Sequence, residues 1–234
     1  MSTVVGVVTF PGTNCDHDAL VAVERAGAVA EPVWHQQAHL GRVDAVVLPG
    51  GFAHGDYLRP GALARFSPVM AAVADFAASG GPVLGICNGF QVLTEAGLLP
   101  GALQKNRGLR FVCQPAALQV ASTRSALTNR ATVGQRLTVP IAHFEGNYTC
   151  DADTLARLRD EDRVVLRYVD NPNGSVDDIA GVCNAAGNVV GLMPHPERAS
   201  DPLLGSADGV VLLASLVAAA GSWRQILTAA TAPA

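Results

Sequence analysis

Over residues 3–99, short apolar runs alternate with segments in which apolar residues recur at helical spacing. The apolar runs have the length and β-branched composition of buried strands, and they are Thr3–Phe10, Val29–Trp34, Asp44–Leu48 and Pro82–Ile86. The segments with helical spacing are Asp16–Ala26, Gly61–Ala78 and Phe90–Leu99. Strands that alternate with helices in this way predict a parallel sheet wound with helices.

Beyond Arg110 the pattern changes, because strand-like runs follow one another with little helix between them. These runs are Phe111–Cys113, Ala117–Ser122, Arg136–Phe144, Arg163–Val169, Ile179–Cys183 and Val189–Met193. Turn signals such as Asn173-Gly174 lie between some of them and predict antiparallel hairpins. Helices are expected here at Asp151–Asp160 and at Asp201–Ala220, the second with a break near Gly205.

We therefore expect a single α/β domain over residues 1–234. Its expected fold class is a flavodoxin-like, open and mostly parallel sheet, with helices on both faces and a small antiparallel β extension. A hydrophobic fraction of 49% with 15% charged residues is typical of a well-buried globular protein. The net charge of −4 provides no basic surface for nucleic acid or an anionic membrane, so neither partner is expected.

The chain shows no signal for export or for a membrane span. The start, Met1-Ser2-Thr3, lacks the regions of a signal peptide, and no uncharged apolar run reaches the roughly 18 residues that a membrane helix needs. The number of cysteines is odd and no Cys-x-x-Cys pair occurs, so neither a disulfide framework nor a metal site is indicated. A cytoplasmic location suits these thiols, which are Cys15, Cys87, Cys113, Cys150 and Cys183.

Cys87 is the first candidate for chemistry. The apolar run before it and the amphipathic segment after it predict a strand, a sharp turn and a helix, with Cys87 on the turn. Gly85 and Gly89 indicate a backbone too crowded or too strained for a side chain, as in a nucleophile elbow. At a helix N-terminus, free N–H groups favour a negative charge on sulfur. The alternative is a buried cysteine that ends a core strand.

His195 is the candidate base for this nucleophile. It follows the strand-like run Val189–Met193, between Pro194 and Pro196, so its imidazole leaves the strand end in a defined direction. Ligands collect at the carboxyl ends of strands in a doubly wound sheet, where Cys87 is also expected. Glu197 is close enough in sequence to hold the far ring nitrogen of His195. The alternative is a rigid exit loop with a structural histidine and a solvated carboxylate.

Acyl transfer also requires N–H donors for the oxyanion that develops on the substrate. The glycines of Pro49-Gly50-Gly51, after a predicted strand, could present one backbone N–H, and Asn88, directly after Cys87, could present a second. An ordinary glycine turn is the alternative for Pro49-Gly50-Gly51.

Pro-Gly-Gly at 49–51, Gly-x-Cys-x-Gly-x-Gln at 85–91 and Pro-His-Pro-Glu at 194–197 together resemble a class I glutamine amidotransferase of the triad type. Further stretches narrow the resemblance to one subfamily, and they are residues 10–16, 48–52, 55–59, 140–143 and 171–175. That subfamily comprises the small, bacterial-type glutaminase subunits of phosphoribosylformylglycinamidine synthase, in de novo purine synthesis. The resemblance spans nearly the whole chain.

By this resemblance, Cys87 attacks the side-chain amide of L-glutamine to give a thioester and ammonia, while His195 shuttles protons and Glu197 orients it. The positions that match the oxyanion hole and a substrate contact are Gly51, Asn88 and Gln91. No metal or cofactor is implied for this chain. The ammonia passes to a large synthetase subunit, which uses ATP and magnesium to convert formylglycinamide ribonucleotide to its amidine. A small bridging subunit is the third expected partner.

Three positions depart from the subfamily pattern. Pro60 stands where cysteine is common, Gln114-Pro115 where an Arg-Trp pair is expected, and Phe144 where glycine is usual. They bear on the partner surface or a gate and leave the triad intact. Two other classes stay open: a free-standing hydrolase such as a γ-glutamyl hydrolase, and a non-catalytic subunit that kept the fold. Dependence on a synthetase partner separates the first from an amidotransferase, and substitution of Cys87 separates the second.

Overall fold

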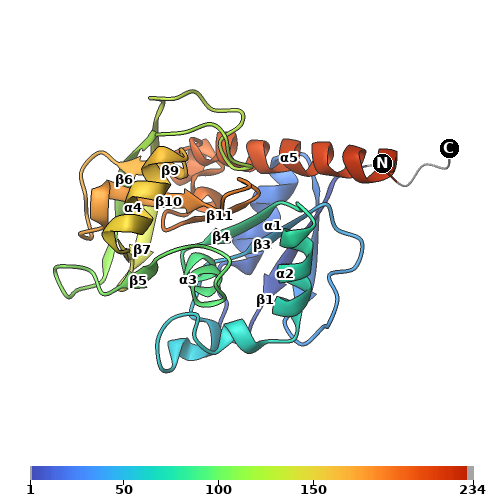
Figure 1. Ribbon diagram of the computed structural model, residues 1–234, viewed down its shortest axis with the longest axis horizontal. Coiled ribbons are helices and arrows are strands. Elements are labelled where there is room, and N and C mark those ends of the chain that lie inside the picture. The colour runs from blue at the N-terminus through green and yellow to red at the C-terminus, as the bar shows by residue number, and fades with distance from the viewer. Residues whose placement is uncertain (1, 231–234) are drawn as a thin grey trace.

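The computed structural model describes residues 2–230, which surround one central sheet (Figure 1). The strands are β1 (Val4–Thr9), β2 (Val29–Trp34), β3 (Ala45–Leu48), β4 (Val83–Ile86), β5 (Ala102–Gln104), β6 (Val112–Val120), β7 (Arg136–His143), β8 (Asn147–Thr149), β9 (Val164–Tyr168), β10 (Ile179–Cys183) and β11 (Val189–Leu192). The α-helices are α1 (Asp16–Arg25), α2 (Val69–Ala78), α3 (Asn88–Glu95), α4 (Ala152–Asp160) and α5 (Gly209–Ala230). The shorter 3₁₀ turns are η1 (Ala53–Asp56), η2 (Ala64–Phe66), η3 (Val176–Asp178), η4 (Pro196–Ala199) and η5 (Pro202–Leu204).

The central sheet has nine strands in the order β2-β1-β3-β4-β11-β10-β9-β6-β7, and its first five are parallel. Strands β3, β4 and β11 are buried at every position, as expected for parallel strands covered on both faces. The steps from β1 to β2 and from β3 to β4 run in opposite directions along the sheet. Right-handed crossovers therefore place α1 and α2 on opposite faces, and the α/β fold class is confirmed.

Strands β10, β9, β6 and β7 continue this sheet through antiparallel pairs. Each such pairing reverses the strand direction, so β9 and β7 run in the same direction as β11. The carboxyl ends of β3, β4, β11, β9 and β7 therefore share one edge of the sheet. Ligands of doubly wound sheets bind at this edge, so the antiparallel strands contribute residues to the same site as the parallel ones.

Two element predictions were wrong near prolines. The expected helix over Gly61–Ala78 is divided into η2 and α2, because Pro68 lacks the N–H of a helix interior and stands at the start of α2. The two short strands expected around Pro115 form the single strand β6. Its register places Pro115 opposite Pro140, and β9 pairs only with Leu118–Val120, so the missing N–H interrupts neither ladder. The small sheet of β5 and β8 had no clear signal in the sequence.

The C-terminal helix also differs from its prediction. The expected helix at Asp201–Ala220 begins instead as η5, in which the Asp201 carboxylate accepts the N–H of Leu203 at 2.9 Å. Gly205 ends this turn with a left-handed φ of 96°, which confirms the expected break. Helix α5 then extends past the predicted end, and Figure 1 shows its last turns projecting beyond the sheet.

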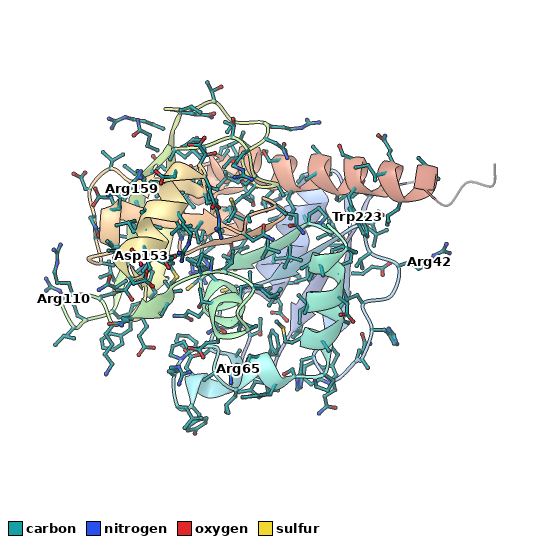
Figure 2. The ribbon with its side chains drawn as sticks, viewed as in Figure 1. Arg42, Arg65, Arg110, Asp153, Arg159 and Trp223 are labelled. Carbon is teal, nitrogen blue, oxygen red and sulfur yellow. The ribbon has the colours of Figure 1, made fainter. Side chains whose placement is uncertain are left out.

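Within residues 2–230, α5 is the one helix long and apolar enough to span a membrane by length and composition alone. Part of its apolar surface packs inside the protein, since Leu212, Leu213 and Leu216 are buried. Figure 2 shows Trp223 beneath the second half of α5, where its ring packs edge-on against Phe76 with centroids 4.7 Å apart.

Candidate active site

The turn between β4 and α3 has the geometry of a nucleophile elbow. Cys87 occupies it with φ 49° and ψ −104°, a strained conformation for a residue with a side chain. A Cβ on Gly89 would overlap the carbonyl oxygen of Leu48, and one on Gly85 would lie 2.6 Å from Leu93 Cδ1. The glycines are therefore required by the close approach of β3, β4 and α3. This geometry excludes an ordinary strand end for Cys87.

His195 and Glu197 complete the predicted triad. The backbone of His195 is fixed by its N–H, which donates to Pro140 O at 2.8 Å. Its Nδ1 lies 2.6 Å from Glu197 Oε1, and both side chains are buried. Its Nε2 is buried and has no hydrogen-bond partner among the described residues, and His195 lines the same cavity as Cys87. Burial alone lowers the pKa of His195, but the charges of Glu197 and Cys87 raise it well above its ordinary value.

The predicted oxyanion positions lie beside this pair. Gly51 has φ 140°, and a Cβ there would be 2.7 Å from the backbone nitrogen of Asn14. A Cβ on Gly50 would be 2.7 Å from His195 Cε1, so the glycine loop fits against the imidazole. Asn88 is the first residue of α3, and the first N–H groups of a helix have no intrahelical acceptor. Its N–H is therefore available at the elbow.

The side chains of Asn88 and Gln91 form a hydrogen-bonded pair on the first turn of α3. Asn88 Oδ1 accepts the N–H of Ala53 at 2.9 Å, and its Nδ2 donates to Gln91 Oε1 at 2.9 Å and to Asp56 Oδ1 at 3.0 Å. Gln91 Nε2 in turn donates to Glu145 O at 2.6 Å. The predicted substrate contact, Gln91, thus faces the cavity while bound to the loop after β7.

A cavity of about 280 Å³ joins these groups, and Cys87, His195, Gly51 and Gln91 all line it. Glu197 lies behind His195. Sequence reasoning assigned no role to seven further polar residues of this cavity, which are Asn14, Cys15, Asp56, Cys113, His143, Glu145 and Arg198. Four of the seven lie inside stretches that carry the family resemblance, so the motifs themselves were the available signal for Asn14, Cys15, Asp56 and His143. Pro60 and Phe144, two of the departures, also line the cavity.

Cys15 lies beside the triad. Its Sγ accepts a hydrogen bond from Arg198 Nη2 at 2.9 Å, and it stands at the start of α1. The nearest ligand-type atoms of Cys15, His195 and Glu197 lie within 4.8 Å of one another. The hydrogen bond between His195 and Glu197 already uses two of these side chains, and the structure gives no further reason to place a metal there.

His143 is a second buried imidazole at this cavity. Its Nδ1 lies 3.1 Å from Asn106 Oδ1, which also accepts the N–H of Gly146. Because Asn106 Oδ1 can only accept a hydrogen bond, Nδ1 of His143 carries the proton in this network. Nε2 of His143 is then an unprotonated acceptor, and it has no partner among the described residues. Burial and the neighbouring His195 lower the pKa of His143 to about 4. His143 is therefore neutral near pH 7.

Comparisons with known proteins agree with this geometry. The chain is 63% identical over 216 residues to the phosphoribosylformylglycinamidine synthase subunit PurQ of Rubrobacter xylanophilus, which covers 92% of this chain and 98% of that one. It is 58% identical over 214 residues to the same-named subunit of Parasynechococcus marenigrum, which covers 91% of this chain and 99% of that one.

A solved structure is similar along most of the chain. A chain in the structure of PurLQS from Thermotoga maritima has a TM-score of 0.87 and 42% identity, covering 93% of this chain and 99% of that chain. The family model for a CobB/CobQ-like glutamine amidotransferase domain matches residues 2–209. The chain accordingly belongs to the CobB/CobQ-like glutamine amidotransferase family.

Proposed function

We propose that this chain is the glutaminase subunit of a phosphoribosylformylglycinamidine synthase and hydrolyses L-glutamine to glutamate and ammonia. One observation carries the chemistry: His195 and Cys87 line one cavity, and the imidazole has its Nδ1 bound to Glu197 and its buried Nε2 without a hydrogen-bond partner among the described residues. This arrangement is that of acyl transfer to a thiol nucleophile. Similarity to PurQ subunits supports the place in purine synthesis.

In the first half-reaction, Cys87 Sγ bonds to the carboxamide carbon of glutamine and its proton moves to Nε2 of His195. The negative charge that develops on the carbonyl oxygen faces the N–H groups of Gly51 and Asn88. The carbon–nitrogen bond then breaks, and the proton on Nε2 passes to the leaving nitrogen. The products are ammonia and a γ-glutamyl thioester on Cys87.

In the second half-reaction, a water attacks the thioester while Nε2 of His195 takes its proton. The carbon–sulfur bond breaks, sulfur regains a proton, and glutamate leaves. Glu197 fixes the Nδ1–H tautomer throughout and stabilises the imidazolium that forms in each half. The raised pKa of His195 fits this role, because the imidazolium must exist long enough to protonate the leaving nitrogen.

The ammonia is used on another chain. We assign ATP and magnesium to a large synthetase subunit, which converts formylglycinamide ribonucleotide to the amidine, with a small bridging subunit in the same cytoplasmic complex. The similarity to a chain of PurLQS supports this assembly. No cofactor is assigned to the present chain.

The test is a comparison of nitrogen donors in the assembled complex. With Cys87→Ser, we expect synthesis from glutamine to stop and synthesis from added ammonia to continue, because the two reactions have separate sites. Cys150→Ser, away from the cavity, is the matched control and should retain both. Loss of both activities in the Cys87 variant would contradict separate sites. Full-speed glutamine hydrolysis by the isolated chain, unchanged by a synthetase, would identify a free-standing hydrolase instead.

A further inference from the structure

Asp56 and Glu145 are two carboxylates that line the same cavity as Cys87. Within residues 2–230, neither forms an ion pair with a lysine, arginine or histidine. They come from loops far apart in sequence, since Asp56 follows β3 and Glu145 follows β7. The proposed hydrolysis of the amide bond requires neither of them.

Both loops are attached to the helical turn that carries the nucleophile. Asn88 Nδ2 donates to the Asp56 carboxylate at 3.0 Å, and Gln91 Nε2 donates to the backbone carbonyl of Glu145 at 2.6 Å. Asn88 and Gln91 are also bonded to each other at 2.9 Å. The two acidic residues therefore have positions fixed relative to Cys87, which directly precedes Asn88.

The environment of Asp56 disfavours its negative charge. Burial raises the pKa of Asp56 to about 6, and the charge of Glu145 adds to this effect against the opposing hydrogen bond from Asn88. The backbone at this loop is also strained, because His54 and Asp56 have left-handed φ values of 55° and 52°. Strain and like-charge repulsion of this kind persist where a ligand compensates them. A bound cation would do so here.

A second observation identifies which ligand this is. His195 lines the same cavity as the two carboxylates, and its Nε2 is buried and has no partner among the described residues. The ligand therefore carries a reacting polar group at one end and a cation at the other. A bare metal ion does not fit, because no metal-type cluster of three or more ligands in the described residues includes Asp56 or Glu145.

We propose that Asp56 and Glu145 bind the α-ammonium group of glutamine and so select an α-amino acid among compounds that carry a terminal carboxamide. The selection rests on the proposed glutaminase function and adds a specificity to it. Asp56 accepts an N–H of the ammonium through the carboxylate oxygen that Asn88 does not contact, and the Glu145 carboxylate binds the ammonium from another side. The ammonium neutralises the pair when the carboxamide reaches Cys87.

The test compares glutamine with glutaramate, which has the same carboxamide and carboxylate and lacks the α-ammonium. Glutaminase kinetics are measured in the assembled complex for the wild type, Asp56→Asn and Glu145→Gln. Removing a charged hydrogen-bond acceptor should lower the ratio of kcat/KM for glutamine to that for glutaramate by about tenfold or more, mainly through KM. Asp75→Asn, an exposed acid on α2, is the matched control and should keep the wild-type ratio.

The outcomes separate the inference from the function on which it rests. If the wild type hydrolyses glutamine and the variants lose both substrates by the same factor, Asp56 and Glu145 only support the loops and the inference is overturned. If the wild-type complex hydrolyses no glutamine, the proposed function itself fails. A variant with too little turnover is tested by calorimetric binding of both compounds in a Cys87→Ala background, where the same fall in preference is expected.

Discussion

Two buried polar regions of this protein differ in how their hydrogen bonds are used. At the active-site edge, His195 Nε2, His143 Nε2 and Glu197 Oε2 are buried and have no partner among the described residues. In the Asn171–Ser175 loop, Asn173 and Ser175 are equally buried, and their side chains are fully bonded. Asn173 Nδ2 donates to Gly146 O at 2.8 Å, and Asn173 Oδ1 accepts from the N–H and hydroxyl of Ser175.

This contrast separates burial from function. An unpaired buried polar atom costs about 1–3 kcal/mol, and at His195 and His143, which both line the cavity, a substrate can supply the missing partner. A fully paired network fixes the shape of a loop and leaves nothing for a ligand. Both regions lie in stretches that carry the family resemblance, so a motif alone does not tell which of them acts on substrate.

The largest expected effect is on enzyme activity, from a substitution in the active site, where the buried polar atoms are unpaired. Glu197→Gln removes the charge that stabilises the His195 imidazolium and keeps a side chain of the same size. We expect kcat for glutamine to fall about 10³- to 10⁴-fold while the melting temperature changes little. Glutaminase assays and calorimetry on the same samples measure both. Glu31→Gln, exposed on β2, is the control, and a wild-type kcat in the Glu197 variant would remove this carboxylate from the mechanism.

The next effect is on stability at the paired loop. Asn173→Ala leaves the N–H and hydroxyl of Ser175 without their shared acceptor and Gly146 O without its best donor. We expect the free energy of unfolding to drop by about 3–5 kcal/mol, with a loss of kcat in the folded fraction far below that of Glu197→Gln. Urea unfolding and activity measured below the transition give the two quantities. If the Asn173 variant had the same urea midpoint as the wild type, the hydrogen bonds of this loop would not contribute to stability, and the contrast with the active site would be wrong.

The smallest effect is a pH dependence that comes from His143. Its pKa is about 4 in the folded chain and near 6.5 when unfolded. Between these values the unfolded state binds more protons, so this group makes stability fall as pH falls from 6.5 to 4, by about 3 kcal/mol in total. The raised pKas of His195 and Asp56 act in the opposite sense, being favourable at low pH and lost as pH rises through each folded value.

The His143 contribution is isolated by difference. His143→Gln has no titrating group at this position. The difference in unfolding free energy between wild type and variant should therefore shrink as pH falls. The other titratable groups are present in both proteins, so their contributions cancel in this difference. Urea unfolding at several pH values measures this gap. A gap that stays constant from pH 6.5 to 4 would mean that His143 does not remain neutral in the folded chain.

The sequence predicted best what depends on neighbours along the chain. Cys87 and Asn88 are adjacent, and His195 reaches Glu197 two positions on, so local spacing was enough to propose one oxyanion donor and the pairing of His195 with Glu197. The pairing of Cys87 with His195 came from the expected strand ends and from the family resemblance. The parallel direction of β1, β3 and β4 was predictable because helical segments separate most of the strand-like runs.

The rest depends on contacts between distant segments. His143 and Glu145 reach the cavity only because four antiparallel pairings return β7 to the direction of β4. Asp56 reaches it through a hydrogen bond to Asn88 that no periodicity encodes. The predicted lengths of elements were wrong where tertiary packing determines them. An example is α5, whose later turns are held by the contact of Trp223 with Phe76.

The nucleophile and its base are carried by adjacent strands of one ladder. Gly85 of β4 is in register with Gly191 of β11, and the N–H of Cys87 donates to Leu192 O at 2.8 Å. The separation between thiol and imidazole is thus set by the spacing of two central strands, which open only when the whole domain unfolds. The alignment of nucleophile and base is therefore a property of the sheet itself, and the loops around the cavity are left to bind the substrate.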